Sequence, residues 1–387
     1  MTPRIKVLTA LTYYHPHWTG LSAIAKGIAE GLAGRGHDVT VLTTRHSPEL
    51  ASEEVVAGVR VVRLRPIGQL SRGMVVPSFP LVSARMIGRH DVVHVHTPMP
   101  EAPLLALLAR AHRRPLVMTH QGDLVMPAGV VNRAIERAGT AMLSVAGRLA
   151  TVVCPLSADY ASTSRFLRPF ASKTVAIHPP VEIPMPDAHA SMAWRRQLGL
   201  TDKRVIGFAG RFVEEKGFDF LLRAIPGLRE IDAGIHLVYA GDHVVAYEDF
   251  FSRCVPLLEP HRDAVTFVGL LRDRRRLADF YAMCDVFALP SRTDMFGAVQ
   301  LEAMLCGTPV VASDIPGARE PVSRTGMGEL VEPRDPTALA DGLLRVLSDL
   351  PRYVRSRSEI EAVYDPTASI EAYEALMTGL LASERAH

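Results

Sequence analysis

The feature that most restricts the fold of this chain is the alternation of short apolar segments with longer amphipathic ones along nearly its whole length. The short segments are rich in Val, Ile and Leu, as buried parallel strands are, and the longer ones have helical periodicity. Alternation of this kind is typical of parallel sheets covered by helices. The sequence therefore predicts an α/β fold of doubly wound parallel sheets.

The expected elements fall into two series. The first-half strands are Ile5–Leu11, Val39–Thr43, Val59–Leu64, Val92–His96, Leu116–His120, Thr151–Cys154 and Thr174–His178, with helices that include Gly20–Gly34, Pro103–His112 and Asn132–Gly147. The second-half strands are Val205–Ala209, His236–Ala240, Val265–Val268, Val286–Leu289, Val310–Ala312 and Gly328–Val331, with helices that include Ala338–Leu347 and Ile370–Leu381.

Prolines at positions 179, 180, 184 and 186 interrupt the alternation near the middle of the chain. Such a segment is typical of a stiff, extended connector. A chain of 387 residues is also too long for one ordinary domain. We therefore predict Rossmann-like domains over residues 1–182 and 183–367, with a C-terminal helix, 368–387, that packs back on the first domain.

Composition argues against several classes of protein. The net charge of +2, without a basic motif, argues against a dedicated nucleic-acid binder. The four cysteines are scattered and form no CxxC pair, so they indicate reduced thiols in the cytosol and not a disulfide framework or a zinc site. There is neither a signal-peptide pattern nor an apolar run of ~18 residues. We expect a cytoplasmic protein.

A dinucleotide-dependent dehydrogenase would share the doubly wound fold but needs a G-x-G-x-x-G turn after the first strand. Residues 12–20 contain no such pattern, and Gly31, Gly34 and Gly36 lie at the far end of the next helix. No P-loop motif is present either. The sequence argues against this class.

The stretch from Ser291 to Ala312 combines a strand end, a polar loop, a helix and another strand. The expected helix, Gly297–Cys306, is apolar on almost every side except for Glu302, and Asp294 lies in the loop before it. Open parallel sheets bind ligands at strand ends, and helix N-termini attract phosphate. The pattern predicts a ligand site; the alternative is that Glu302 pairs with a buried arginine or caps a loop.

A second polar loop follows the first strand of the second half. It places Arg211 and Lys216 between Gly210 and Gly217, and both cations suit phosphate oxygens. A solvated loop in which Glu214 and Glu215 neutralise the cations is the alternative. The position at a strand end favours a phosphate site.

These two loops together resemble the donor-binding domain of glycosyltransferase family 4. The first half agrees, since Thr19-Gly20 resembles the family's N-terminal glycine turn and Asp91–His96 its central strand. The resemblance covers essentially the whole chain. It implies the GT-B fold, two Rossmann-like domains facing a cleft, and a retaining transferase that takes a sugar from a nucleotide diphosphate.

Two positions depart from the family pattern. Asp294 stands where the E-x7-E motif usually begins with Glu, which places its carboxylate about 1.5 Å further back. Thr19 stands where the glycine turn usually has its first Gly, so only Gly20 keeps unrestricted backbone freedom. Both changes concern the donor-sugar pocket.

The resemblance also implies roles for individual residues. Arg211 and Lys216 would hold the diphosphate, Glu302 the ribose hydroxyls and Asp294 the donor sugar, while His120 would line the reaction centre. A structural role for His120 is the alternative. The full expected donor set is Gly20, Gly210, Arg211, Lys216, Val268, Leu270, Asp294, Phe296, Gly297, Ala298 and Glu302, and the expected catalytic set is His120, Arg211, Lys216 and Asp294.

No metal or other cofactor is expected. No D-x-D spacing occurs, and GT-B enzymes are metal-independent as a rule. His15, His17, His94 and His96 could form a metal site, but the sequence favours ordinary packing of these side chains on adjacent strands. The basic run at 272–276 is interpreted as a solvated face.

The sequence leaves the second substrate open. We expect a UDP- or GDP-sugar donor and a hydroxyl acceptor, with a lipid-linked or cell-envelope glycan precursor as one candidate. Residues 68–82 and 122–127 are candidate linings for it, and they suggest peripheral contact with the inner face of a membrane. An epimerase or hydrolase of the same architecture, or a non-catalytic binding protein, remains an alternative. The oligomeric state is open.

Overall fold

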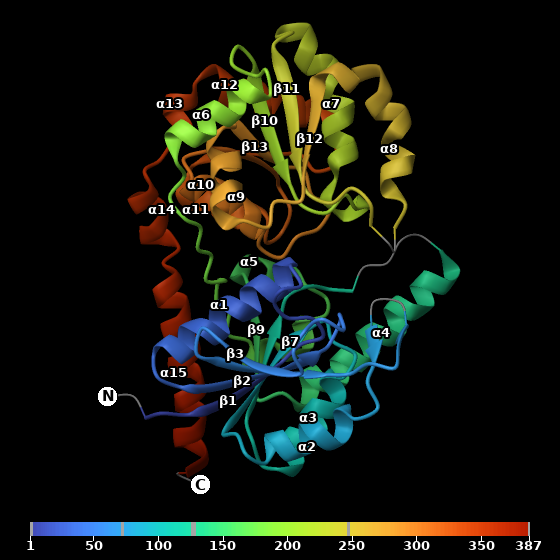
Figure 1. Ribbon diagram of the computed structural model, residues 1–387, viewed down its shortest axis with the longest axis vertical. Coiled ribbons are helices and arrows are strands. Elements are labelled where there is room, and N and C mark those ends of the chain that lie inside the picture. The colour runs from blue at the N-terminus through green and yellow to red at the C-terminus, as the bar shows by residue number, and fades with distance from the viewer. Residues whose placement is uncertain (1–2, 71–72, 125–128, 246–247, 386–387) are drawn as a thin grey trace. The chain divides into compact units, whose positions relative to one another are not determined.

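The structure is a computed structural model that describes residues 3–70, 73–124, 129–245 and 248–385. Contacts within the chain divide it into two units (Figure 1). Unit 1 comprises Met1–Pro180 and Pro366–His387, and unit 2 comprises Val181–Asp365. The C-terminal helix therefore belongs to unit 1, although it follows unit 2 in the sequence.

Unit 1 is built on a seven-stranded sheet in the order β3-β4-β2-β1-β7-β8-β9, in which β3 and β4 pair antiparallel and the other neighbours pair parallel. Its strands are β1 Lys6–Ala10, β2 Asp38–Thr44, β3 Glu53–Val56, β4 Val59–Leu64, β7 Val92–Thr97, β8 Leu116–His120 and β9 Val152–Pro155. A separate hairpin pairs β5 (Gly68–Leu70) with β6 (Gly73–Val75). Buried Val, Leu, Met and Ala side chains of β1, β2, β7 and β8 form the centre of its core.

The helices of unit 1 begin with one that follows β1 directly. They are α1 Gly20–Gly34, α2 Phe79–Ile87, α3 Ala102–Ala111, α4 Val130–Leu149, α5 Ala158–Thr163, the 3-10 helix η1 Arg168–Lys173 and α15 Pro366–Arg385. Helix α1 begins at Thr19, whose side chain accepts a hydrogen bond from the backbone N–H of Ser22 in a capping box.

The C-terminal helix α15 packs on α1, and Figure 1 shows this red helix beside the blue start of the chain. A methyl group added at Gly31 would lie 2.6 Å from the Ile370 side chain, so the small residue permits the close approach. The buried carboxylate of Glu374 accepts hydrogen bonds from Arg35 at 2.6 Å and pairs with His37 at 2.8 Å. These contacts fix the last helix to the first.

Unit 2 is built on a six-stranded parallel sheet in the order β12-β11-β10-β13-β14-β15. Its strands are β10 Arg204–Ala209, β11 Ile235–Ala240, β12 Val265–Gly269, β13 Val286–Leu289, β14 Val310–Ser313 and β15 Gly328–Val331. Its helices are α6 Ala188–Gln197, η2 Glu214–Lys216, α7 Phe218–Ile231, α8 Phe250–Leu258, η3 Glu259–Ala264, α9 Arg274–Ala282, α10 Ala298–Leu305, α11 Arg319–Thr325, α12 Pro336–Ser348, α13 Leu350–Tyr353 and α14 Arg357–Val363.

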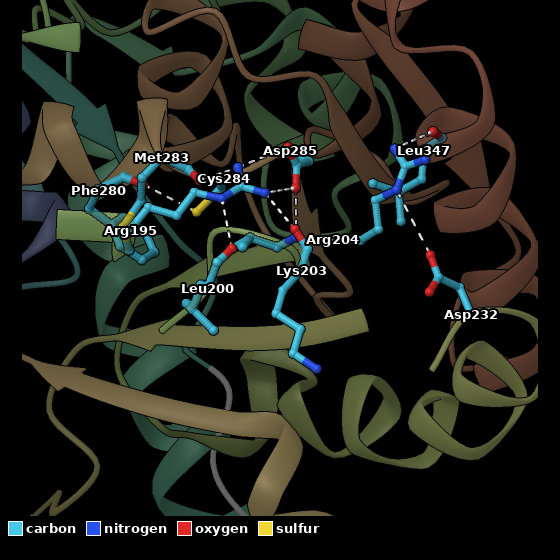
Figure 2. Close-up of polar contacts among 11 residues, drawn as sticks. Arg195, Leu200, Lys203, Arg204, Asp232, Phe280, Met283, Cys284, Asp285 and Leu347 are labelled. Atoms are coloured by element: carbon cyan, nitrogen blue, oxygen red, sulfur yellow. Dashed lines mark hydrogen bonds and ion pairs between the residues drawn. The ribbon is translucent and has the colours of Figure 1, made fainter. Parts of the chain in front are cut away.

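A half-buried ion pair fixes the amino edge of the unit 2 sheet (Figure 2). Arg195 on α6 donates two hydrogen bonds to the carboxylate of Asp285, at 3.0 and 2.8 Å. Asp285 also accepts the backbone N–H of Val205, so it ties the start of β10 to the start of β13. This arrangement lies at the edge opposite the strand ends at which parallel sheets bind ligands.

The expected strand Thr174–His178 is wrong. This segment makes one bridge, between Thr174 and Val153, and hydrogen bonds from Val175 and Ile177 to the β9 backbone, but no strand is assigned to it. The Pro179-Pro180 pair that follows lacks backbone N–H groups and restricts the residue before it. The segment therefore runs along β9 without extending the sheet.

The apolar loop expected at 68–82 divides between core and surface. Val76 and Phe79 are buried, whereas Val75 and Leu81 are exposed, and residues 71 and 72 lie outside the described part of the chain. Residues 125–127 of the other expected lining, 122–127, also lie outside it. Among the described residues, no helix has both the length and the apolar character needed to cross a bilayer.

Candidate active site

The polar loops of unit 2 meet where the order of its strands reverses. Strand β10 lies between β11 and β13, and the chain runs outward from β10 in both directions. Doubly wound sheets bind ligands at the carboxyl ends of such a strand pair. Arg211 and Lys216 follow β10, and Asp294 follows β13, so the topology brings together residues about eighty positions apart in the sequence.

Lys216 and Asp294 form an ion pair at the centre of this edge. Lys216 Nζ lies 2.6 Å from Asp294 Oδ2, and Asp294 Oδ1 accepts the backbone N–H of Gly297 at 2.9 Å. Burial alone would raise the pKa of Asp294, but Lys216 and the N–H groups of Gly297 and Phe296 lower it below its usual value. Burial would likewise lower the pKa of Lys216, and Asp294 raises it instead. Both groups are therefore charged at neutral pH.

Two glycines make the approach of these loops sterically possible. Gly217 has φ of 69°, and a methyl group there would lie 1.9 Å from the backbone oxygen of Pro290 at the end of β13. Gly297 has φ of 66° and precedes α10, whose first turn has no side-chain cap. Because helix N-terminal N–H groups lack partners within the helix, this terminus can receive an anion or a hydroxyl. Phe296 is buried below it.

Glu302 on α10 is buried, and both of its oxygens have protein partners. Arg274 Nη1 donates to Oε1 at 2.7 Å, and Tyr281 Oη donates to Oε2 at 2.8 Å. Arg274 also donates to the backbone oxygen of Glu182 in the connector. The arginine partner that the sequence left open as an alternative is therefore present. A ribose contact for Glu302 stays a prediction.

The interpretation of the 272–276 run as a solvated face is wrong for two of its arginines. Arg274 is held by Glu302, and Arg276 lies over the Trp194 ring at 3.3 Å. Asp273 is the N-cap of α9, so the arginines that follow it lie on different faces of that helix. Arg274 faces α10, and Arg276 faces α6. A count of consecutive charges does not reveal which face of a helix they occupy.

The remaining expected donor residues of unit 2 lie at the same edge of the sheet. The guanidinium of Arg211 pairs with Glu215 at 2.9 Å. Gly210 directly follows β10, and its backbone oxygen accepts a hydrogen bond from Tyr239. At the end of β12, Val268 is half-buried and Leu270 is exposed. Ala298 is the first residue of α10.

In unit 1, Gly20 is the first residue of α1 and is exposed. Its neighbour Thr19, which departs from the family's glycine pattern, caps this helix through Ser22. The threonine therefore has a structural role that a glycine could not supply.

His120 ends β8 and is completely buried. One ring nitrogen lies 3.1 Å from Thr97 Oγ1, the other 3.0 Å from Asp123 Oδ1, and the ring stacks on Phe166 at 4.5 Å. Burial would raise the pKa of Asp123, but hydrogen bonds from His120 and Tyr160 lower it. The geometry fits the structural alternative for His120, and a catalytic role stays a prediction.

The histidines of β7 are neutral core residues. Burial lowers the pKa of His94 to about 3 and that of His96 well below its usual value. His94 Nε2 lies 2.8 Å from Thr119 Oγ1, and His96 Nδ1 lies 2.7 Å from Gln121 Nε2. Within the described ranges, no group of three or more His, Cys, Asp or Glu side chains is arranged to hold a metal.

Sequence reasoning missed the groups that support these residues. Tyr281 and Asp219 each bind a predicted site residue or its loop from another helix. One signal was available for Asp219, a carboxylate in the first turn of a buried helix. For Tyr281 the pairing depends on how α9 and α10 pack on the sheet.

Comparison with known families agrees with this arrangement in both units. Residues 203–349 match the model for glycosyl transferases group 1, and residues 19–180 match the model for a glycosyl transferase 4-like domain. The two matches cover the expected donor residues of unit 2 and, in unit 1, the chain from Thr19 and Gly20 onward.

Individual relatives match over most of their length. An uncharacterised glycosyltransferase of Methanocaldococcus jannaschii is 31% identical over 89% of this chain and 90% of its own. A GDP-mannose-dependent α-(1-6)-phosphatidylinositol monomannoside mannosyltransferase of Mycolicibacterium smegmatis is 32% identical over 81% of this chain and 82% of its own. A crystal structure of HepE from Anabaena with UDP-glucose has a TM-score of 0.76 at 20% identity and covers 98% of this chain and all of that one, which shows the fold.

The two family matches, the full-length relatives and the paired parallel sheets lead to one conclusion: the chain belongs to glycosyltransferase family 4 and is a glycosyltransferase with the GT-B fold.

Proposed function

We propose that this enzyme transfers a sugar from a UDP- or GDP-sugar to a hydroxyl acceptor, with retention of configuration and without a metal ion. The observation that carries the proposal is the Lys216–Asp294 pair beside the uncapped N-terminus of α10, at the switch point of the unit 2 sheet. Cations and backbone N–H groups at such an edge suit a diphosphate.

The proposed donor site stabilises the leaving group. Lys216 keeps its proton, since Asp294 raises its pKa, and it therefore offers a fixed positive charge to the diphosphate. Arg211 adds a guanidinium within the same loop, and the N–H groups at the start of α10 add dipoles. Preorganised charge of this kind is worth most where negative charge develops during the reaction.

The proposed transfer needs no nucleophilic carboxylate from the protein. The bond between the anomeric carbon and the diphosphate oxygen breaks, and the acceptor oxygen bonds to that carbon on the same face. The acceptor proton passes to the departing diphosphate oxygen, so atoms and charge balance. Asp294 would face the positive charge that develops on the sugar ring, in keeping with its lowered pKa.

For the acceptor we propose a polyhydroxylated molecule bound at the carboxyl edge of the unit 1 sheet. Tyr13, His17 and His46 form a group of stacked and edge-on rings after β1 and β2. Nearby, Tyr14 Oη and His15 Nδ1 are buried without hydrogen-bond partners among the described residues. Such polar atoms can bind hydroxyls, and rings can contact the C–H face of a sugar.

A lipid-linked acceptor is the specific candidate that we favour. The mannosyltransferase of Mycolicibacterium smegmatis, by its name, acts on a phosphatidylinositol monomannoside. Because that relative matches about four-fifths of both chains at 32% identity, acceptors with a cyclitol or sugar headgroup form the first panel to test.

The experiment is a transfer assay with EDTA present, in which UDP-glucose and GDP-mannose are each offered with a panel of inositol phosphates, phosphoinositides and simple sugars. We expect nucleotide diphosphate release that depends on the acceptor, and a product whose anomeric proton retains the donor's configuration by NMR. Release without acceptor would identify a hydrolase. Tight donor binding without release would identify a binding protein.

A further inference from the structure

We propose that Arg292 is a positioning residue that holds the Lys216 loop and the Asp294 loop in register. It lies two residues before Asp294, in the loop after β13, and is largely buried. No site prediction made from the sequence included it. The inference rests on the proposed donor site, because it concerns how the two charged groups of that site are held.

Arg292 contacts the Lys216 loop through both its backbone and its side chain. Its backbone N–H donates to the backbone oxygen of Glu215 at 2.7 Å, and Nη1 donates to the backbone oxygen of Glu214 at 2.7 Å. Glu214 and Glu215 are the first two residues of η2, and Lys216 is the third. These two hydrogen bonds therefore tie the two residues before Lys216 to the loop that bears Asp294.

The same guanidinium is fixed from its other side by Asp219 in the first turn of α7. Nη1 lies 2.7 Å from Asp219 Oδ1, and Nη2 lies 2.8 Å from Oδ2, so the pair is bidentate. The guanidinium carbon lies 4.1 Å from the centre of the Phe220 ring. Asp219 retains only 8% exposure of its side chain, so the pair is shielded from solvent.

This geometry requires arginine and not merely a positive charge. One planar group donates to a carboxylate and to a backbone oxygen while its face rests on an aromatic ring. A lysine at position 292 has one compact ammonium group that cannot reproduce the bidentate pair and the stacking together. Displacement of a reacting group by about 1 Å can cost as much as a hundredfold in rate.

The chain supplies a matched control for the loss of such a pair. Arg195 forms another bidentate pair, with Asp285, in the same unit and with similar burial, at the opposite edge of the sheet (Figure 2). Arg195→Lys removes a comparable pair of hydrogen bonds and leaves the Lys216 and Asp294 loops unchanged. A purely structural role for Arg292 predicts that the two lysine variants behave alike.

The experiment measures three properties of the whole protein with Arg292→Lys, Asp219→Asn and Arg195→Lys. These are the free energy of unfolding in urea, the affinity of the folded protein for UDP and GDP by calorimetry, and the kcat and KM for donor and acceptor. We expect all three variants to lose stability. Arg292→Lys and Asp219→Asn should also lower kcat/KM for the donor by about tenfold to a hundredfold and weaken diphosphate binding, with the acceptor KM unchanged. Arg195→Lys should leave binding and kinetics unchanged.

Two outcomes overturn the inference. Either Arg292→Lys binds diphosphate and turns over as the wild type does, or Arg195→Lys loses activity in step with its stability. Wild-type protein that binds neither UDP nor GDP would instead overturn the proposed function on which the inference rests. Diphosphate affinity is read on folded protein well below each melting temperature, so a loss of stability alone cannot produce the expected result.

Discussion

At the scale of single residues, the Lys216–Asp294 pair sets how the donor site responds to pH. The pKa of Asp294 is lowered in the folded state, so its contribution to stability is present above the unfolded value of about 3.9 and is lost as pH falls through the folded value. The pKa of Lys216 is raised, so its contribution is present below about 10.4 and is lost as pH rises past its folded value. The pair is therefore complete from about pH 5 to 9.

Asp294→Asn leaves the buried Lys216 charge without its carboxylate. We expect a loss of about 3 kcal/mol in the free energy of unfolding at pH 7. The difference from wild type should shrink below about pH 4, where the unfolded wild-type chain binds a proton at Asp294 more readily than the folded protein does. Urea titrations at pH 7 and pH 3.5 measure it. A difference that stays constant with pH would show that the ion pair is not its source.

The role of Glu302 can be separated from its ion pair by using 2′-deoxynucleotides. If Glu302 accepts a ribose hydroxyl, wild-type protein should prefer the ribonucleotide diphosphate by about tenfold, the value of one hydrogen bond to a charged group. Glu302→Ala should lose that preference, whereas Arg274→Ala, which removes the partner and keeps the carboxylate, should retain it. Equal preference in wild type and Glu302→Ala would leave the Arg274 pair as the only role of this carboxylate.

The sequence located residues better than it located their partners. Arg211, Lys216, Asp294 and Glu302 were predicted as site candidates from loops at strand ends, and the structure places all four at one edge of the unit 2 sheet. Their contacts could not be read from spacing, because Lys216 meets Asp294 only through the adjacency of β10 and β13.

At the scale of elements, the turn between η2 and α7 depends on a residue without a side chain. Gly217 has positive φ, and a methyl group there would overlap the backbone oxygen of Pro290. We expect Gly217→Ala to cost about 1–3 kcal/mol and to weaken diphosphate binding, since the end of β13 must move away from Lys216.

Gly227 in α7 is the control for that substitution. Nothing lies within 4 Å of a methyl group added there, and the residue is exposed. Gly227→Ala should therefore stabilise the protein by about 0.5–1 kcal/mol, because alanine favours a helix interior. Chemical denaturation of Gly217→Ala and Gly227→Ala measures the free energy of unfolding of each variant, and equal changes would contradict the steric argument.

Element boundaries could be predicted where hydrophobic pattern and packing agree, and less well where they diverge. The apolar strands β7, β8 and β13 were expected within one residue of their ends. The segment 174–178 has the pattern of a strand but is followed by prolines and does not extend the sheet. Thr19 departs from the glycine turn of the family pattern, and its capping box with Ser22 defines the start of α1.

At the scale of the whole molecule, the chain returns to its first unit through α15, and Glu374 is the central contact of that return. Glu374→Gln weakens the hydrogen bonds to Arg35 and His37, and we expect unit 1 to lose about 2 kcal/mol of stability. Nucleotide diphosphate affinity, which belongs to unit 2 in the proposed function, should not change. Thermal unfolding together with calorimetry checks both parts. A fall in affinity without a fall in stability would contradict this assignment.

The architecture of both units was predicted from the alternation of strand and helix. No pattern in the sequence indicates the proposed acceptor site, since the unpartnered atoms of Tyr14 and His15 and the rings around them are brought together only when the ends of β1 and β2 meet. The donor side is more predictable, because its residues lie within two short loops and one helix.

The most direct test of the central claim is equilibrium binding of UDP- and GDP-sugars, with EDTA present, to wild-type protein and to Lys216→Met. The proposed donor site predicts that the wild type binds sugars of one base and that Lys216→Met, which removes the charge facing the diphosphate, binds them at least about tenfold more weakly. Failure of the wild type to bind any nucleotide sugar, or equal binding by the variant, would contradict the donor site at the β10–β13 switch point.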